Sequence, residues 1–96
     1  MRLRTIEGYP GAFSHYCPGC DMRHVLPPGW TFNGNLERPT FVPSFRHQWG
    51  GEGKKCCHYN LTDGQLFFHA DSTHKLAGQT VELPDVDLFP QMFPQQ

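Results

Sequence analysis

Cys17-Pro18-Gly19-Cys20 places two thiols on either side of a Pro-Gly turn. With two residues between them, both sulfur atoms can reach one tetrahedral metal ion, as they do in structural zinc sites. A chain of 96 residues has little stability to spare, and a metal ion that joins separate segments is a common remedy at this size. The stretch therefore predicts a fold held together by Zn2+.

A redox role for the same two thiols is the alternative. A redox-active C-x-x-C pair belongs to a thioredoxin-like strand and helix, but Pro18-Gly19 fills this motif and no amphipathic helix follows it. Residues 1–8 lack the apolar segment of a signal peptide. We therefore expect a cytoplasmic, reducing location, where thiols bind metal more readily than they pair.

The composition favours short strands and irregular loops. Ten glycines and nine prolines leave no stretch that predicts a long helix, and eight phenylalanines indicate an aromatic core. We predict a mostly β, small zinc-ribbon-like domain of short antiparallel hairpins with irregular Pro/Gly-rich loops. Residues 1–84 form this single zinc-stabilised domain, and residues 85–96 form a Pro- and Gln-containing tail that either lies over the core or docks on a partner.

The charge pattern argues against two classes of partner. The formal net charge is −1 and the basic residues are scattered, so no duplex DNA is expected. No apolar run approaches the length of a membrane-spanning helix, so no membrane partner is expected. Aromatic residues between Trp30 and Trp49 would suit single-stranded nucleic acid only with interleaved cations, and Arg38 and Arg46 are the only ones there. We expect these aromatic residues to form the core.

Two hairpins are predicted. Residues 12–26 form the first, with the paired thiols at its turn. Residues 56–70 form the second around Asp63-Gly64, a dipeptide that suits a two-residue turn with positive φ.

The register of the second hairpin assigns its side chains to two faces. With Thr62 opposite Gln65, one face is wholly apolar, which makes the register self-consistent. Because successive strand side chains alternate, Cys57 lies on the core face, while His58 and His69 lie on the other. We therefore expect Cys57 and His58 not to share a metal ion.

The ligand set follows from these faces. Cys57 is the best third thiol because its strand face is buried, and the adjacent Cys56 points the other way as a free cysteine. For the fourth ligand His74 comes first, since the chain can fold back over the site there; His24 is next and His58 is third. The predicted zinc ligands are Cys17, Cys20, Cys57 and His74.

The remaining histidines carry less weight. His15 and His47 are expected at the surface, as isolated polar residues usually are. His69 faces His58 across the second hairpin, and two imidazoles placed in this way could bind a second metal ion, although many such pairs have no function.

No catalytic motif emerges from the sequence. The zinc deaminase pattern and H-E-x-x-H are absent, and neither a Ser-His-Asp motif nor a Gly-rich phosphate loop is found. Asp71 is the one carboxylate near the predicted site, and it either orients a metal-bound histidine or forms a turn.

In combination, several short motifs resemble a small family of uncharacterised proteins of bacteriophages and prophages that often carry the label ammonia monooxygenase. The motifs are Cys17-Pro18-Gly19-Cys20, Trp30-Thr31-Phe32-Asn33-Gly34, Pro39-Thr40-Phe41-Val42-Pro43-Ser44, Cys57-His58 and Asp71-Ser72-Thr73-His74-Lys75-Leu76-Ala77-Gly78-Gln79-Thr80-Val81.

The resemblance covers about residues 13–84 and implies a phage or bacterial origin and a Cys/His metal site. Many relatives carry a cysteine where this chain has Ser72, which favours His74 as the ligand. Nothing in the chain matches an oxygenase. More distant relatives are encoded beside ubiquitin-like conjugation genes, which implies a role in protein–protein contacts.

The sequence thus favours a non-enzymatic, phage- or prophage-encoded accessory protein in the host cell cytoplasm. It would have a structural zinc site and act as a protein–protein interaction module. Its partner is expected to be another protein, of host or phage, and a homodimer is compatible with the aromatic content. The first alternative is a small metal-dependent hydrolase with a site near His24, His58, Asp71 and His74; the second is single-stranded nucleic-acid binding.

Overall fold

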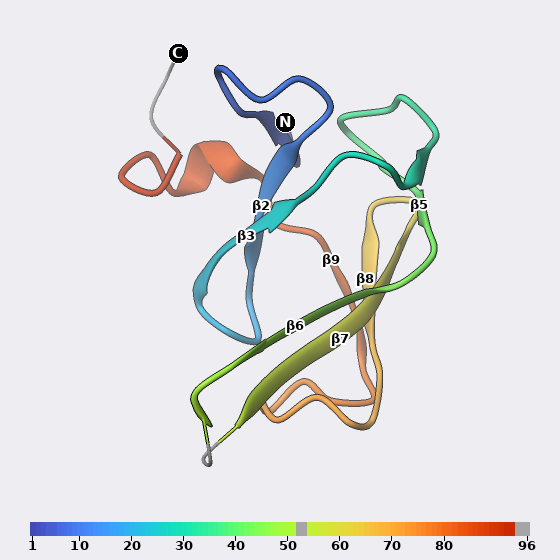
Figure 1. Ribbon diagram of the computed structural model, residues 1–96, viewed down its shortest axis with the longest axis vertical. Helices are drawn as coiled ribbons and strands as arrows, with labels where there is room; N and C mark the ends of the chain where they lie inside the picture. Colours follow the sequence, from blue (N-terminus) through green and yellow to red (C-terminus); the bar gives the residue numbers. More distant parts are fainter. Residues whose placement is uncertain (52–53, 94–96) are drawn as a thin grey trace.

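Short antiparallel strands make up most of the regular structure in the computed structural model, which describes residues 1–51 and 54–93 (Figure 1). In chain order the elements are β1 (Arg4–Thr5), β2 (Phe13–Cys17), β3 (Met22–Leu26), β4 (Thr31–Phe32), β5 (Phe41–Val42), β6 (Phe45–Trp49), β7 (Lys55–Thr62), β8 (Gln65–Phe68), β9 (Thr80–Glu82) and the 3-10 helix η2 (Val86–Leu88). The predicted mostly β domain of short hairpins is confirmed.

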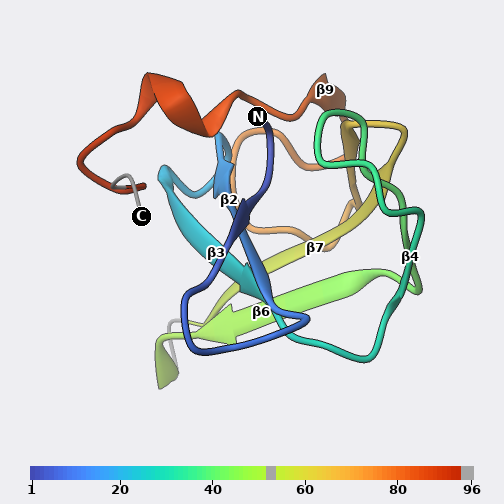
Figure 2. The same cartoon turned by 90° about the horizontal axis from the view of Figure 1, so that it is seen from above.

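The strands of the described residues pair into small sheets with the orders β1-β2-β3, β4-β5 and β6-β7-β8-β9. Seen from above, the β2–β3 hairpin crosses the long β6–β7 hairpin (Figure 2). Buried side chains from both hairpins and from neighbouring segments share one core: Leu3, Cys17, Leu26, Phe41, Phe45, Cys57, Tyr59, Leu61, Leu66, Phe68 and Leu83. The aromatic core predicted from the composition is therefore present, with Phe41 and Phe45 fully inside it.

The register of the β7–β8 hairpin agrees with the sequence prediction. Thr62 pairs with Gln65, and the Asp63-Gly64 turn has positive φ at both residues. Cys57 is fully buried, whereas His58 is half-buried on the opposite face of β7. A two-residue turn thus decides which side chains of β7 enter the core, because a slip by one residue would exchange the two faces.

Strand β6 is absent from the sequence prediction. Its residues alternate between the core and solvent, with Phe45 buried and Arg46 exposed, as expected for a strand with one covered face. The predicted extended segment around Phe41 ends at Pro43, and β6 begins two residues later. Three of its five residues are polar, so the sequence does not indicate a strand here. The strand forms through its pairing with β7.

Residues 85–93 lie against the N-terminal sheet. The side chain of Asp85 accepts a hydrogen bond from Asp87 N at 2.9 Å and caps η2. Val86 and Phe93 are buried, and the ring of Phe89 stacks on Tyr16 at 3.8 Å between centroids. This part of the predicted tail therefore covers the core; residues 94–96 lie outside the described part of the chain.

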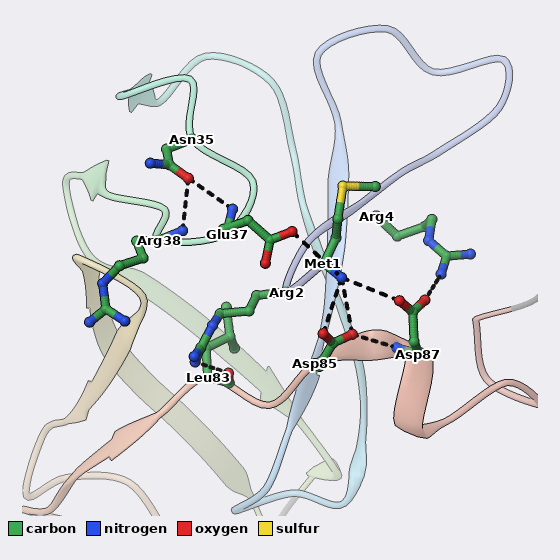
Figure 3. Close-up of polar contacts among 9 residues, drawn as sticks. All are labelled: Met1, Arg2, Arg4, Asn35, Glu37, Arg38, Leu83, Asp85 and Asp87. Atoms are coloured by element: carbon green, nitrogen blue, oxygen red, sulfur yellow. Dashed lines mark hydrogen bonds and ion pairs between the residues drawn. The ribbon is translucent and has the colours of Figure 1, made fainter.

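Ion pairs also join the two ends of the described chain (Figure 3). The Met1 amine lies 3.1 Å from an oxygen of Asp85 and 3.3 Å from Asp87, and Arg4 lies 2.8 Å from Asp87. These carboxylates are about half exposed, so solvent screens the pairs and apolar burial supplies most of the anchoring.

The turn between β7 and β8 can be tested with two glycine variants. Gly64 has φ +72° and a Cβ there would lie 3.1 Å from Arg38 Cα, whereas Gly78 has φ +77° with open space around it. We expect Gly78→Ala to cost about 1–2 kcal/mol for its left-handed backbone. Gly64→Ala should cost at least about 1 kcal/mol more, because backbone cannot move aside easily. Urea unfolding measures both, and equal losses would contradict this packing.

Candidate functional site

The first part of the site is the turn between β2 and β3. Asp21 N donates to the carbonyl of Cys17 at 2.8 Å, which closes the turn, and Asp21 adopts φ 53°. Cys17 ends fully buried and Cys20 half-buried. Residue 19 has to be glycine in this packing, because a Cβ there would overlap the ring of His74.

Three thiols and one imidazole converge beneath this turn. Ligand atoms of Cys17, Cys20, His24 and Cys57 all lie within 4.8 Å of one another. The sulfur atoms of Cys17 and Cys57 are 3.7 Å apart. Two sulfurs bound at about 2.3 Å to one tetrahedral ion are separated by roughly 3.8 Å, whereas a disulfide requires about 2.05 Å. The spacing therefore fits a shared metal ion.

The three thiols also shift one another's pKa values. A hydrogen bond from Cys57 lowers the pKa of Cys17 to about 3. Burial, followed by the charge on Cys17, raises the pKa of Cys20 to about 12. The hydrogen bond to Cys17 and burial together raise the pKa of Cys57. Close thiolates repel one another, so a bound cation is what would allow all three to ionise.

His24 contributes a buried nitrogen that no protein group satisfies. Among the described residues its Nε2 has no hydrogen-bond partner, and a buried polar atom of this kind is costly unless a ligand meets it. The donor set of three sulfurs and one imidazole is one that zinc favours. The cluster thus fits a metal ion, with three of the four predicted ligands in it.

His74, the predicted fourth ligand, lies beside this cluster. Its Nε2 is 3.5 Å from the sulfur of Cys57, and its Nδ1 accepts a hydrogen bond from Leu76 N at 3.2 Å. A metal-bound histidine usually donates from its other nitrogen. This arrangement instead leaves the proton on Nε2, facing Cys57. His74 as a ligand stays a prediction, and the geometry favours His24.

A buried polar network adjoins the cluster. His15 Nδ1 donates to Tyr16 O at 3.1 Å, the Tyr59 hydroxyl donates to His15 Nε2 at 2.6 Å, and His47 Nε2 donates to Tyr59 Oη at 3.0 Å. His15 is fully buried, so its predicted surface placement is wrong, whereas His47 is half-buried. Burial, with repulsion from His24, lowers the pKa of both rings to about 4, which keeps them neutral.

On the other face of β7, three side chains form a hydrogen-bonded line. Ser44 Oγ donates to His58 Nε2 at 3.2 Å. His58 Nδ1 donates to Asp71, with its two oxygens at 3.1 and 3.2 Å. The order of serine, imidazole and carboxylate is that of a nucleophile, its general base and the group that orients the base.

Neighbouring groups hold this line in place. Arg46 Nη2 donates to Asp71 at 3.1 Å. Desolvation raises the pKa of Asp71, but the hydrogen bond from His58 and the charges of His58 and Arg46 outweigh it, so the pKa is lowered overall. Trp30 Nε1 donates to the carbonyl of Ser44 at 3.3 Å, and the ring of His69 stacks on His58 at 4.0 Å.

The sequence shows no Ser-His-Asp motif, but the fold brings together a serine, a histidine and an aspartate in this order. Ser44 precedes β6, His58 lies on β7, and Asp71 follows β8, with at least a dozen residues between each pair. No local spacing links them. The one local signal is the register of the Asp63-Gly64 hairpin, which places His58 on the face of β7 opposite Cys57.

The described part of the chain contains no helix with the length and apolar character needed to cross a membrane.

Comparison with known proteins finds a matching family. The model of the BubE family, described as bacterial ubiquitination-like system serine protease, matches residues 2–69 of the 96. The matched span contains Ser44 and His58 and ends shortly before Asp71. No curated protein and no solved structure matches the chain.

Metal content per chain separates the two candidate histidines. We expect Cys57→Ser and His24→Ala each to lose the ion, because each removes a member of the cluster. His74→Ala should keep it, since its Nε2 acts as a hydrogen-bond donor to Cys57. Inductively coupled plasma mass spectrometry on the purified variants measures this. Loss of metal from His74→Ala with retention in His24→Ala would establish the ligand set predicted from the sequence.

Proposed function

Because this chain belongs to the BubE family, we propose that it is a serine protease acting in a bacterial ubiquitination-like system. Ser44 is the nucleophile, His58 the general base and Asp71 the residue that orients the base. The observation that carries the proposal is the continuous line from Ser44 Oγ through both ring nitrogens of His58 to the Asp71 carboxylate.

The geometry supports a two-step peptide hydrolysis. His58 Nε2 takes the proton from Ser44 Oγ as that oxygen attacks the peptide carbonyl carbon, and the same proton then passes to the leaving amine. Water then gives a proton to His58 Nε2 as its oxygen attacks the acyl carbon; the bond between that carbon and Ser44 Oγ breaks, the acid product leaves, and His58 returns the proton to Oγ. Asp71 accepts the Nδ1 hydrogen throughout, so it holds the ring orientation and stabilises the imidazolium.

The exposure of the site favours a protein substrate. The side chains of Arg46 and Asp71 are about half exposed and that of His58 is 17% exposed, so the line of proposed catalytic groups reaches the surface of the sheet. An open face admits an extended segment of a folded protein, whereas small molecules are usually enclosed in a pocket. We infer that the substrate is a segment of a ubiquitin-like component, which agrees with the expectation of a protein partner.

The metal cluster serves structure in this proposal, and we propose Zn2+ as its ion. Cys17, Cys20, His24 and Cys57 would hold it, and four protein ligands leave no position for a substrate. A bound ion supplies a crosslink between the β2–β3 hairpin and β7. The origin in a phage or prophage remains a prediction that the family match does not address.

The competing functions have less support. A metal-dependent hydrolase would need its four predicted residues around one point, but His24 joins the thiols on the core side while His58 and Asp71 lie on the opposite face of β7. A nucleic-acid platform would need exposed aromatic rings, and Phe41 and Phe45 are buried. A purely non-enzymatic module leaves the hydrogen-bonded line without a role.

A serine-reactive fluorophosphonate tests the nucleophile. We expect one adduct per wild-type chain, located on Ser44 by peptide mass spectrometry, and none on Ser44→Ala. His58→Ala should slow the labelling by about 10²–10⁴-fold, the usual contribution of a general base. Thr62→Val, an exposed site at the far end of β7, is the matched control and should label at the wild-type rate. Equal labelling of wild type and Ser44→Ala would contradict the assignment.

The substrate class is tested with a ubiquitin-like protein of a bacterial ubiquitination-like system that carries a C-terminal extension. Wild-type protein should remove residues from this extension, and the shortened product should appear by intact mass spectrometry. Asp71→Asn should reduce the rate at least about a hundredfold because the carboxylate no longer fixes the His58 tautomer. An intact substrate after incubation with wild-type protein that labels normally would reject this substrate class while leaving the nucleophile in place.

A further inference from the structure

The metal cluster and the catalytic line share two short stretches of chain. In β7, Cys57 belongs to the cluster and the next residue, His58, to the catalytic line. After β8, Asp71 contacts His58 and, three residues later, His74 contacts Cys57. The two sites lie on opposite faces of one strand, and residues 71–74 reach both of them.

Residues 72 and 73 attach this segment to β7 through their hydroxyl groups. The paired register of β8 with β7 ends at Tyr59 and Phe68. Beyond that point, Ser72 Oγ accepts from His58 N at 3.0 Å and donates to His58 O at 3.0 Å. The Ser72 hydroxyl thus bonds to both main-chain groups of His58.

Thr73 makes a similar pair of hydrogen bonds to Cys56, two residues before His58 in β7. Its backbone N donates to Cys56 O at 2.9 Å, and its Oγ1 accepts from Cys56 N at 3.0 Å. The side-chain hydroxyls of Ser72 and Thr73 therefore make hydrogen bonds that a neighbouring strand would otherwise make. These bonds fix where residues 71–74 lie along β7.

His74 ties the far end of the segment to the metal cluster. Its ring lies against Gly19 in the turn that carries Cys17 and Cys20, and its Nε2 is 3.5 Å from the Cys57 sulfur. The ring also meets Phe68 edge-on at 4.5 Å between centroids. Movement of the thiols would therefore displace His74 and, through two intervening residues, Asp71.

We propose that the metal cluster positions the catalytic line through residues 71–74, with Ser72 and Thr73 as positioning residues. The ion takes no part in peptide hydrolysis, yet the activity depends on it because Asp71 keeps its place against His58 only while the segment is anchored. This inference rests on the proposed function of Ser44, His58 and Asp71. A displacement of about 1 Å at such a group can reduce the rate a hundredfold.

Hydroxyl-removing variants of the full chain test the attachment. Ser72→Ala and Thr73→Val should keep one ion per chain and a wild-type circular dichroism spectrum. Both should lower the rate of fluorophosphonate labelling of Ser44 at least tenfold. Thr73→Ser retains the hydroxyl and should restore the rate, and Thr62→Val is the matched control. Labelling of Ser72→Ala and Thr73→Val within twofold of wild type would overturn the proposal.

A proton NMR measurement reads the contact itself. The His58 Nδ1 hydrogen shared with Asp71 should give a downfield signal in wild-type protein that disappears in His58→Ala. We expect Ser72→Ala to weaken this signal with its metal content unchanged, which a merely structural loss of stability would not do. If wild-type protein is not labelled by the fluorophosphonate, the proposed function fails, while this signal still tests the positioning.

Metal removal completes the test. A chelator applied below the unfolding temperature should lower the labelling rate and the downfield signal in proportion to the ion lost, and added Zn2+ should restore both. A folded, metal-free chain that labels at the full rate would overturn the proposal. If chelation unfolds the chain, the hydroxyl variants, which retain their ion, decide the question.

Discussion

The meeting of two sulfur atoms, Cys17 from β2 and Cys57 from β7, is the contact on which the rest of the structure depends. These strands belong to different sheets, and no backbone ladder joins them in the described part of the chain. A domain of this size has a modest core. The 3.7 Å approach of the two thiols therefore brings the two sheets together at a point where a larger protein would bury a longer interface. A metal ion there would lock the β2–β3 hairpin against the four-stranded sheet.

Strand β7 connects the contact between the two thiols to the proposed catalytic residues. Because its side chains alternate, one residue step separates a buried thiol, Cys57, from the imidazole of His58, the proposed general base, on the opposite face. The precision required of a catalytic group comes from the rigidity of its supporting element. A metal ion bound to Cys57 would give the neighbouring His58 a firm base in a small, loop-rich domain.

Polar groups inside this core are matched to one another. The Tyr59 hydroxyl lies between the rings of His15 and His47. When both rings are neutral, each of its two hydrogen bonds to them has one donor and one acceptor. A small domain thereby accommodates one buried and one half-buried histidine without burying a charge. His24 is the exception, since its Nε2 has no partner among the described residues, and that exception marks the metal cluster.

The sequence alone determined the metal motif and the hairpin register. The two-residue spacing of Cys17 and Cys20 and the Asp63-Gly64 turn are local features, so their geometry follows from neighbouring residues. Only the tertiary structure brought Ser44 to His58 and then Asp71, because three segments separated by whole strands share no sequence period. The placement of His24 among the thiols likewise comes from the tertiary structure, because it depends on the approach of the β2–β3 hairpin to β7 and not on the spacing of His24 from Cys57 along the chain.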